Sequence, residues 1–347
     1  MKKHIMIGAL PPPLGGTTVL FQQLVDELMI FNRFDVFVIN TSNKSSGIYF
    51  KLVTLIKTIY LVMKNIRSSS SVSFHGSING ALLFFPILRL LCILFNRPVI
   101  FRSFGGDFDV KHKNMPQFKQ WIFNKFVLSA DVLLFETKVS VEYFSSFTQS
   151  EIEWYANSRP FDNSSLPEKN KSNDIKVVFI GHVKPSKGVV DLVKAANSND
   201  NNIEVHVYGP LQDGLTEMDL NGVNTRYCGV LKPENITSTL SNYNWLALPT
   251  YYDGEGYPGV ILEAFSMGLP VLTTKWRCIP EIVDETCGLL VEPCSSAAIL
   301  DALKLISSDD IDYSLLHNGA INQADNFSSK KWTKIYANIV IKLSDNA

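Results

Sequence analysis

The sequence has little that would support a disulfide-bonded, metal-bearing or membrane-spanning protein. Its five cysteines are scattered without a Cys-x-x-Cys pair, and no histidine cluster has the spacing of zinc ligands. The apolar segment 81–95 is shorter than the ~20 residues that cross a bilayer, and it contains Pro86 and Arg89. The N-terminal apolar stretch reaches prolines too early for a secretory signal. We therefore expect a cytoplasmic protein without a structural metal.

Charged residues are also scarce, at 19%, and they are unevenly distributed. Residues 1–165 hold 17 Lys and Arg against 11 Asp and Glu, whereas the remainder holds 15 against 22. The basic N-terminal half fits an anionic surface such as membrane lipid or a pyrophosphate-linked acceptor, although solvated lysines would give the same count. The segment 50–66 also leaves two interpretations open, since its lysines and wide apolar face suit a core-packed or an interfacial helix.

The chain has ample material for a core, because 46% of its residues are hydrophobic. Its 347 residues are too many for one ordinary core and predict two domains with a cleft between them. We predict domains at 1–165 and 174–329, joined by a polar linker at 160–174, and a closing amphipathic helix at 330–347.

Short apolar runs alternate with helix-period segments, a pattern that predicts strand–helix–strand units and parallel α/β sheets. The strands expected in the first domain are HIMIGAL, DVFVIN, SVSFHG, PVIFRSFG, DVLLFET and IEWYAN. Those expected in the second domain are KVVFIG, IEVHVYG, WLALP and PVLTT.

The most informative segment is DGEGYPGVILEAFSMGLPV, residues 253–271. Its glycine-rich turn carries Glu255 and leads into a helix whose start is indicated by Pro258 and Gly259. Such a loop presents backbone N–H groups and the positive end of a helix to an anion such as a diphosphate. Glu255 can accept hydrogen bonds from sugar hydroxyls and Glu263 from ribose hydroxyls. Taken alone, two such glutamates are more often a helix cap and a surface charge.

The string EGYPGVILEAFSMGLPV, in which seven residues separate two glutamates, closely resembles the signature of retaining GT-B glycosyltransferases, especially glycosyltransferase family four. The resemblance implies two Rossmann-like α/β domains facing a central cleft, with a C-terminal helix that crosses back to the N-terminal domain. It implies that Glu255 contacts the donor sugar and Glu263 the nucleotide ribose. The backbone expected to face the sugar and diphosphate is that of Gly256, Tyr257, Pro258, Gly259 and Val260.

A second segment, FIGHVKPSKGVVDLVKAA (179–196), resembles the family's strand-to-helix element that begins at a donor-binding glycine, here Gly181. In the family an arginine and a lysine of this element neutralise the diphosphate. Lys187 matches the lysine, but His182 occupies the arginine position, which replaces a permanently charged side chain by an imidazole. With no Asp-x-Asp pair placed for a metal, the resemblance implies Glu255, Lys187 and His182 as the catalytic residues.

The N-terminal turn PPPLGGTTVL resembles the family's glycine loop, so Gly15 and Gly16 are expected near the donor phosphates. Its spacing is not Gly-x-Gly-x-x-Gly, which argues against dinucleotide binding. The segment 100–109 lacks the histidine that many family members carry near the reacting carbon. The acceptor-side candidates are therefore His75, Arg102 and Asp107, although such residues are more often structural.

The resemblance implies metal-independent transfer of a hexose-type sugar, with retained configuration, from a UDP- or GDP-sugar co-substrate to a saccharide or lipid-linked saccharide. We expect a role in bacterial surface polysaccharide synthesis, O-antigen or capsule, with peripheral contact to the inner face of an anionic membrane and no nucleic-acid partner. Two alternatives stay open: an inactive donor-binding subunit or scaffold of a partner transferase, and a GT-B epimerase or phosphorylase, which shares the fold but not the EGYPGVILE string.

Overall fold

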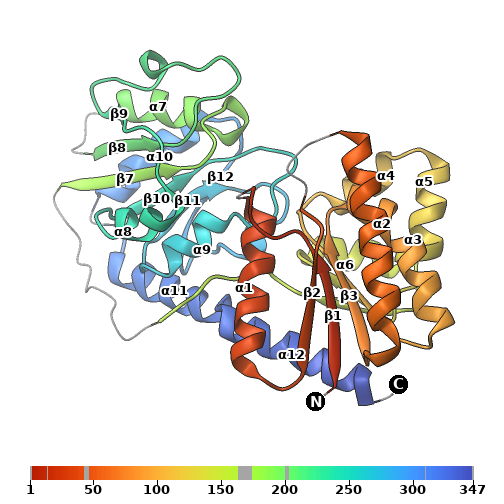
Figure 1. The fold of residues 1–347 in the computed structure, drawn as a ribbon. Coiled ribbons are helices and arrows are strands. Elements are labelled where there is room, and N and C mark those ends of the chain that lie inside the picture. Colours follow the sequence, from red (N-terminus) through yellow and green to blue (C-terminus); the bar gives the residue numbers. More distant parts are fainter. Residues whose placement is uncertain are drawn as a thin grey trace. The chain divides into compact units, whose positions relative to one another are not determined.

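The computed structural model describes residues 2–13, 15–42, 47–162, 174–199, 203–308 and 310–345. The chain forms two compact units, each with a six-stranded sheet (Figure 1). The first unit comprises Met1–Ser158 and Ser329–Ala347, and the second comprises Arg159–Ser328. The first unit thus ends before residue 165, and most of the predicted linker, 163–173, lies outside the described residues.

The sheet of the first unit has the strand order β2-β1-β3-β4-β5-β6, with every pairing parallel. The strands are β1 Lys3–Gly8, β2 Asp35–Asn40, β3 Ser71–Gly76, β4 Val99–Ser103, β5 Val132–Phe135 and β6 Glu151–Trp154. All six correspond to strands predicted from the sequence. Because β4 and β5 are buried at every position, they lack an apolar–polar alternation, as expected for strands covered on both faces.

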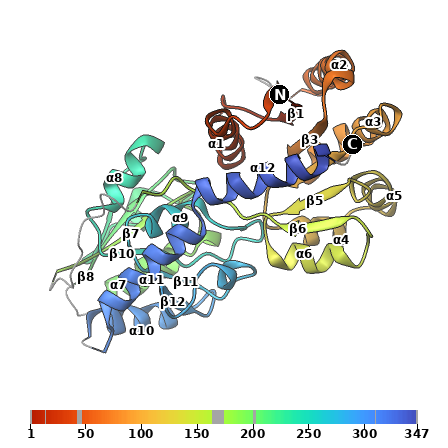
Figure 2. The ribbon, with the colours of Figure 1, turned by 90° about the horizontal axis from the view of Figure 1, so that it is seen from below.

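The helices of the first unit are α1 Gly16–Phe31, α2 Ile48–Asn65, α3 Ile78–Leu94, α4 Phe108–Asn114, α5 Gln117–Ile122, α6 Lys138–Ser145 and α12 Ser329–Asp345. The last of these returns from the end of the chain to pack on α1 and β3 (Figure 2). Trp332 and Tyr336 are buried there, and Thr333 Oγ1 donates to Glu27 Oε2 at 2.7 Å. The first unit therefore contains residues from both ends of the sequence, which pack against each other.

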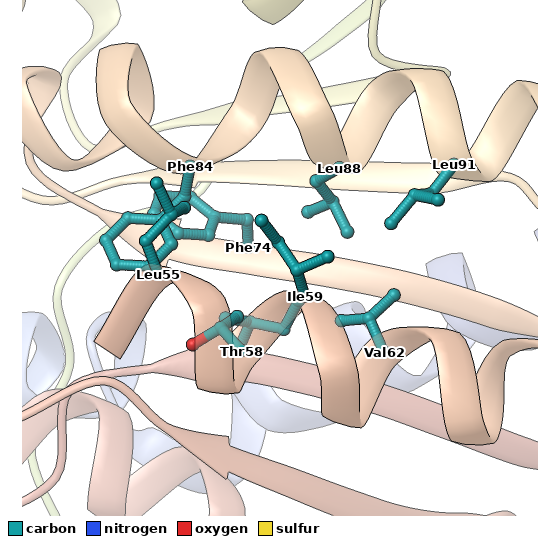
Figure 3. A pocket seen from close by; sticks show the side chains of 9 residues that line it. Leu55, Thr58, Ile59, Val62, Phe74, Phe84, Leu88 and Leu91 are labelled. Atoms are coloured by element: carbon teal, nitrogen blue, oxygen red, sulfur yellow. The ribbon is translucent and has the colours of Figure 1, made fainter. Parts of the chain in front are cut away.

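Helix α2 is apolar on two opposite faces. Thr54, Thr58 and Val62, spaced four residues apart, are buried, so one face packs in the core as one interpretation of the segment requires. Across a narrow apolar pocket this face meets side chains of α3 such as Leu88 (Figure 3). The opposite face is exposed and forms what we name the α2 outer row, Tyr49, Leu52, Val53, Ile56, Tyr60 and Met63. Among the described residues, no helix has the length and hydropathy needed to cross a membrane.

A buried polar cluster connects the sheet of the first unit to α12. His4 in β1 lies 2.7 Å from Ser71 Oγ through Nδ1, and its Nε2 lies 3.1 Å from Ser73 Oγ and 3.0 Å from the Tyr336 hydroxyl. Burial lowers the pKa of His4 to about 3, with the Ser71 hydrogen bond opposing it. Burial first, and then the charge of Arg102 and His4, holds the pKa of His75 well below its ordinary range. Both imidazoles are therefore neutral in the folded chain at neutral pH.

Acid should destabilise the chain through His4. Because its pKa is lower in the folded than in the unfolded state, the unfolded state binds more protons between these values, and the stability present above pH ~6.5 is lost as the pH falls. For this one group, moving from about pH 7 to about pH 5 should cost about 2 kcal/mol. Urea unfolding at both pH values should show a smaller difference for His4→Gln than for wild type. The exposed His182→Gln serves as the control, and identical pH dependence in wild type and His4→Gln would contradict this account.

The sheet of the second unit has the order β12-β11-β10-β7-β8-β9, again entirely parallel. Its strands are β7 Ile175–Ile180, β8 Ile203–Tyr208, β9 Thr225–Tyr227, β10 Trp245–Leu248, β11 Val271–Thr274 and β12 Gly288–Val291. Its helices are α7 Val189–Asn197, α8 Ile236–Leu240, α9 Gly259–Phe265, α10 Ser296–Ser307 and α11 Tyr313–Asn326. The four predicted strands are confirmed, whereas β9 and β12 were not predicted. The two units together give the α/β class with two Rossmann-like sheets that the sequence predicted.

Candidate functional site

The candidate site of the second unit is built on two loops that follow the neighbouring strands β7 and β10. Ligands of parallel α/β sheets bind at the carboxyl ends of the strands, which is where both loops begin. The backbone N–H of Tyr251 donates to the carbonyl of Ser186 at 2.9 Å, so the loops are tied to each other. This contact brings Lys187 of the first loop beside Glu255 of the second.

Glu255 is buried at the turn that precedes α9, with 7% of its surface exposed. Its Oε2 accepts hydrogen bonds from Lys187 Nζ and, at 2.8 Å, from Thr250 Oγ1. The Cys278 thiol lies 3.3 Å from the carbonyl oxygen of Gly256 and 3.5 Å from that of Glu255, and so fixes the turn. Oε1 has no hydrogen-bond partner among the described residues. One carboxylate oxygen is thus fixed by the protein and the other is available to a ligand hydroxyl.

Lys187 is the last residue of a short 3-10 turn, Pro185–Lys187, in the loop that follows β7. Its ammonium group forms the ion pair with Glu255 and lies 5.1 Å from the centre of the Tyr252 ring. Because an ammonium group has three donors and the carboxylate engages one, two remain for an anionic ligand. The side chain is only 13% exposed, so its charge is little screened by water.

Gly188 allows the loop of Lys187 to approach the loop of Glu255. Its φ of +72° is in the left-handed region, and a Cβ at this position would lie 1.9 Å from the carbonyl oxygen of Pro249. Backbone cannot yield as a flexible side chain can, so only glycine fits here. The sequence Lys-Gly therefore positions the lysine through the glycine that follows it.

Replacing Gly188 by alanine should destabilise the second unit by roughly 3 kcal/mol or more, since backbone strain and overpacking add. Gly214→Ala is a matched control, because Gly214 also has a positive φ, +82°, but no atom lies within 4 Å of its added Cβ. We expect about 1 kcal/mol for the control, measured by urea unfolding. Equal losses in the two variants would show that the contact with Pro249 is unimportant.

Glu263 lies on α9 and is fixed by a residue that the sequence did not indicate. Its Oε1 accepts from Arg159 Nε at 2.7 Å, and its Oε2 has no hydrogen-bond partner in the described part of the chain. A Cβ on Gly259 would lie 1.8 Å from Arg159 Nη2, so the absence of a side chain there admits the guanidinium. Like Glu255, Glu263 therefore has one engaged and one available oxygen.

Of the remaining donor-side candidates in the second unit, those of the glycine-rich turn lie between these two carboxylates in the chain. Gly256, Pro258, Gly259 and Val260 form the turn and the first residues of α9, as the sequence predicted. The Tyr257 side chain is buried and its hydroxyl donates to a carboxylate oxygen of Glu281, so only its backbone can face a ligand. Gly181 directly follows β7, and a Cβ on Gly209 would lie 1.7 Å from its carbonyl oxygen.

His182 is exposed beside Gly181, with Nδ1 2.8 Å from Gln212 Nε2. The hydrogen-bond partner of His182 is a neutral amide. This position therefore lacks the permanent positive charge that the family's arginine would bring. The cationic side chains on this loop are those of Lys184 and Lys187. Lys184 Nζ lies 3.7 Å from the centre of the Tyr252 ring. Lys187, in contrast, is paired with the carboxylate of Glu255.

In the first unit, His75 and Arg102 lie side by side in register at the ends of β3 and β4. Each is 2% exposed. His75 Nε2 lies 2.9 Å from Ser73 Oγ, whereas His75 Nδ1 and Arg102 Nε and Nη1 have no hydrogen-bond partner among the described residues. The guanidinium lies 4.4 Å from the centre of the Tyr155 ring, and burial lowers the pKa of Arg102. These unsatisfied buried nitrogen atoms distinguish the pair from an ordinary structural cluster.

Asp107 and the two N-terminal glycines are less distinctive. Asp107 forms an ion pair of 2.8 Å with Lys111 one turn along α4. Gly15 precedes α1 and its N–H donates to Thr18 Oγ1 at 3.0 Å. A Cβ on Gly16 would meet no atom within 4 Å, so the packing of the first unit does not itself require glycine at this position.

The described residues contain no cluster of three or more His, Cys, Asp or Glu suited to hold a metal ion. The site instead offers the ammonium group of Lys187 and two half-engaged carboxylates, Glu255 and Glu263. A cation can stabilise a departing anion, and carboxylates can orient the hydroxyls of a polyol. This combination matches the chemistry of a ligand that contains both phosphate and sugar.

Comparison with known proteins agrees with the family resemblance found in the sequence. Residues 161–324 match the family described as Glycosyl transferases group 1. O-antigen chain mannosyltransferase B of Escherichia coli is 30% identical over 168 residues, which cover 45% of this chain and 43% of that protein. The putative teichuronic acid biosynthesis glycosyltransferase TuaC of Bacillus subtilis is 24% identical over 134 residues, 39% of this chain and 33% of that protein. The matches thus span less than half of the length of these curated relatives.

Solved structures extend the similarity of the fold to the whole chain. HepE of Anabaena, solved in complex with UDP, superposes with a TM-score of 0.70 at 14% identity, covering 99% of this chain and 100% of that one. The family match covers the second unit, and the structural similarity covers both units. The chain has the GT-B fold, and its residues 161–324 match the glycosyl transferases group 1 family.

Proposed function

We propose that this protein is a retaining, metal-independent glycosyltransferase that moves a hexose-type sugar from a UDP- or GDP-sugar to a saccharide acceptor. The observation that carries the proposal is the pairing of Lys187 with Glu255 at the carboxyl ends of β7 and β10, with Glu263 on the adjoining helix. The UDP bound to HepE supports a nucleoside diphosphate as the leaving group.

In the proposed reaction the bond between the anomeric carbon and the diphosphate oxygen breaks, and its electron pair leaves with the diphosphate. Lys187 donates to that diphosphate and offsets the negative charge that develops there. The acceptor hydroxyl forms the new bond on the face that the diphosphate leaves, and its proton passes to a diphosphate oxygen. Glu255 holds a hydroxyl of the donor sugar through Oε1, and Glu263 holds the ribose through Oε2.

The other donor contacts that we propose are made by backbone. The backbone of the glycine-rich turn would face the sugar and diphosphate; this turn consists of Gly256, Tyr257, Pro258, Gly259 and Val260. The phosphates would be able to approach the chain closely at Gly181, Gly15 and Gly16. His182 would donate one hydrogen bond. His75, Arg102 and Asp107 are proposed for the acceptor side, where Arg102 offers unsatisfied donors to an anionic or hydroxyl-rich acceptor.

We propose that the acceptor is a saccharide or lipid-linked saccharide of bacterial surface polysaccharide synthesis, made at the inner face of the cell membrane. Both curated relatives carry names from such pathways, O-antigen and teichuronic acid. The basic charge of the first unit supports a pyrophosphate-linked acceptor.

Nucleotide release tests the proposal against its alternative, an inactive donor-binding scaffold, which the histidine at position 182 keeps open. The purified chain is incubated with UDP- and GDP-sugars in chelator, with and without oligosaccharide acceptors, and beside Glu255→Gln. We expect acceptor-stimulated release of one nucleotide by the wild type alone. Binding of a nucleotide without release above the Glu255→Gln level would favour the scaffold.

A further inference from the structure

Helix α2, which carries the α2 outer row, exposes more large hydrophobic side chains than any other helix of the described first unit. Ile56 is 66% exposed and Tyr60 is 63% exposed. The six members recur at intervals of three and four residues, so they form a single stripe along the helix. The opposite face of α2 already supplies the core contacts, so the outer row is not needed to hold the helix in place.

Two neighbouring helices extend the exposed apolar surface. Helix α3 packs beside α2, as the interleaved side chains of Figure 3 show, and it exposes Ile87, Leu90 and Leu94 at the same helical spacing. Helix α5 packs beside α3 and exposes Phe118 and Trp121, at 62% and 58%. Three adjacent helices thus expose apolar and aromatic side chains. Such a group differs from the single exposed hydrophobic residues that are normal on protein surfaces.

The charged residues of α2 and α3 have one sign. Residues 36–106, which include all of α2 and α3, contain eight Lys and Arg and no Asp or Glu. Lys57 and Lys64, two turns apart on α2, are exposed beside the outer row. Lys125 lies 4.8 Å from the centre of the exposed Trp121 ring. Asp131, which contacts α3, is paired with Arg89 of that helix at 3.1 Å.

We infer that α2, α3 and α5 form a docking surface for an anionic phospholipid bilayer, lying in its interface without crossing it. Tyrosine and tryptophan favour this depth, where a ring can be buried while its polar atom stays hydrated. Lysines that border an apolar helix face are attracted to anionic headgroups and can extend toward them. A second copy of this chain is a poor occupant, because a symmetric contact would bring the same lysines together.

Vesicle co-sedimentation tests the inference without any donor or acceptor, so its outcome is separate from that of the proposed transfer reaction. We expect binding to phosphatidylglycerol-containing vesicles at low salt, and weak binding to phosphatidylcholine vesicles or at high salt. Ile56→Glu should reduce binding at least ~10-fold, since it places a charge in the apolar stripe. The double variant Lys57→Glu, Lys64→Glu should abolish the preference for anionic lipid.

Ile30→Glu is the matched control, because Ile30 is 84% exposed on α1 of the same unit and lies outside this surface. It should bind vesicles as the wild type does. Ile56→Glu should keep the wild-type melting temperature and its activity on a water-soluble saccharide acceptor. Failure of the wild type to bind anionic vesicles, equal binding by Ile56→Glu, or a dimer that Ile56→Glu dissociates would each overturn the inference.

Discussion

Replacing Lys187 by methionine should reduce the rate of sugar transfer by about 10²- to 10³-fold. Methionine keeps most of the volume of the lysine stem and removes its charge. The ammonium group is the cation paired with Glu255 and is only 13% exposed, so water cannot take over its role against the departing diphosphate. The effect should fall on kcat for transfer, measured as nucleotide release.

Lys194→Met is the matched control for Lys187→Met. Lys194 is an exposed lysine of α7 in the same unit, and its removal changes the net charge equally. We expect less than ~3-fold change in its rate, because exposed charges are screened. Lys187→Arg should recover part of the activity, since the charge is kept. Equal rates in the two methionine variants would remove Lys187 from the reaction.

Replacing Glu263 by glutamine should weaken binding of the nucleotide by about 10²-fold, the second large effect. Hydrogen bonds to a charged acceptor contribute roughly 1.5–3 kcal/mol each, and two ribose hydroxyls would share this carboxylate. The loss should appear as a higher Kd for the nucleoside diphosphate, measured by isothermal titration, with a smaller change in kcat.

The ion pair of Glu263 with Arg159 supplies the control that separates ligand binding from structure. Arg159→Gln removes the same ion pair while leaving the carboxylate. If Glu263 binds ribose, Glu263→Gln should raise the Kd for the nucleoside diphosphate much more than Arg159→Gln does. If its only role is to hold Arg159, the two variants should weaken binding equally.

The fold could be predicted largely because its strands are continuous apolar runs. Segments such as DVFVIN and SVSFHG gave the bounds of β2 and β3 directly. The two strands that were missed are short: β9, Thr225–Tyr227, has three residues and an exposed arginine, and β12, Gly288–Val291, has four. Their pairing is decided by the neighbouring strands β8 and β11, which local periodicity does not reveal.

The residues of the candidate site were predictable where a motif contained them and unpredictable where the contact comes from a distant part of the sequence. The resemblance indicated Glu255, Glu263 and Lys187. Arg159, which is 104 positions from Glu263, has no local signal, and it became visible only with the fold. Thr250, which fixes Glu255, directly follows the apolar run WLALP, and the rule that ligands gather at strand ends would have found it.

The central claim is that Lys187 acts on a nucleoside diphosphate in the second unit. The most direct test is to titrate wild type and Lys187→Met, in chelator, with UDP and GDP and with uridine and guanosine, which lack the diphosphate. We predict that one diphosphate binds the wild type about 100-fold or more tightly than its nucleoside, and that Lys187→Met shrinks this ratio to about 10-fold or less while nucleoside affinity is kept. An unchanged ratio in Lys187→Met, or no binding of either diphosphate to the wild type, would contradict the account.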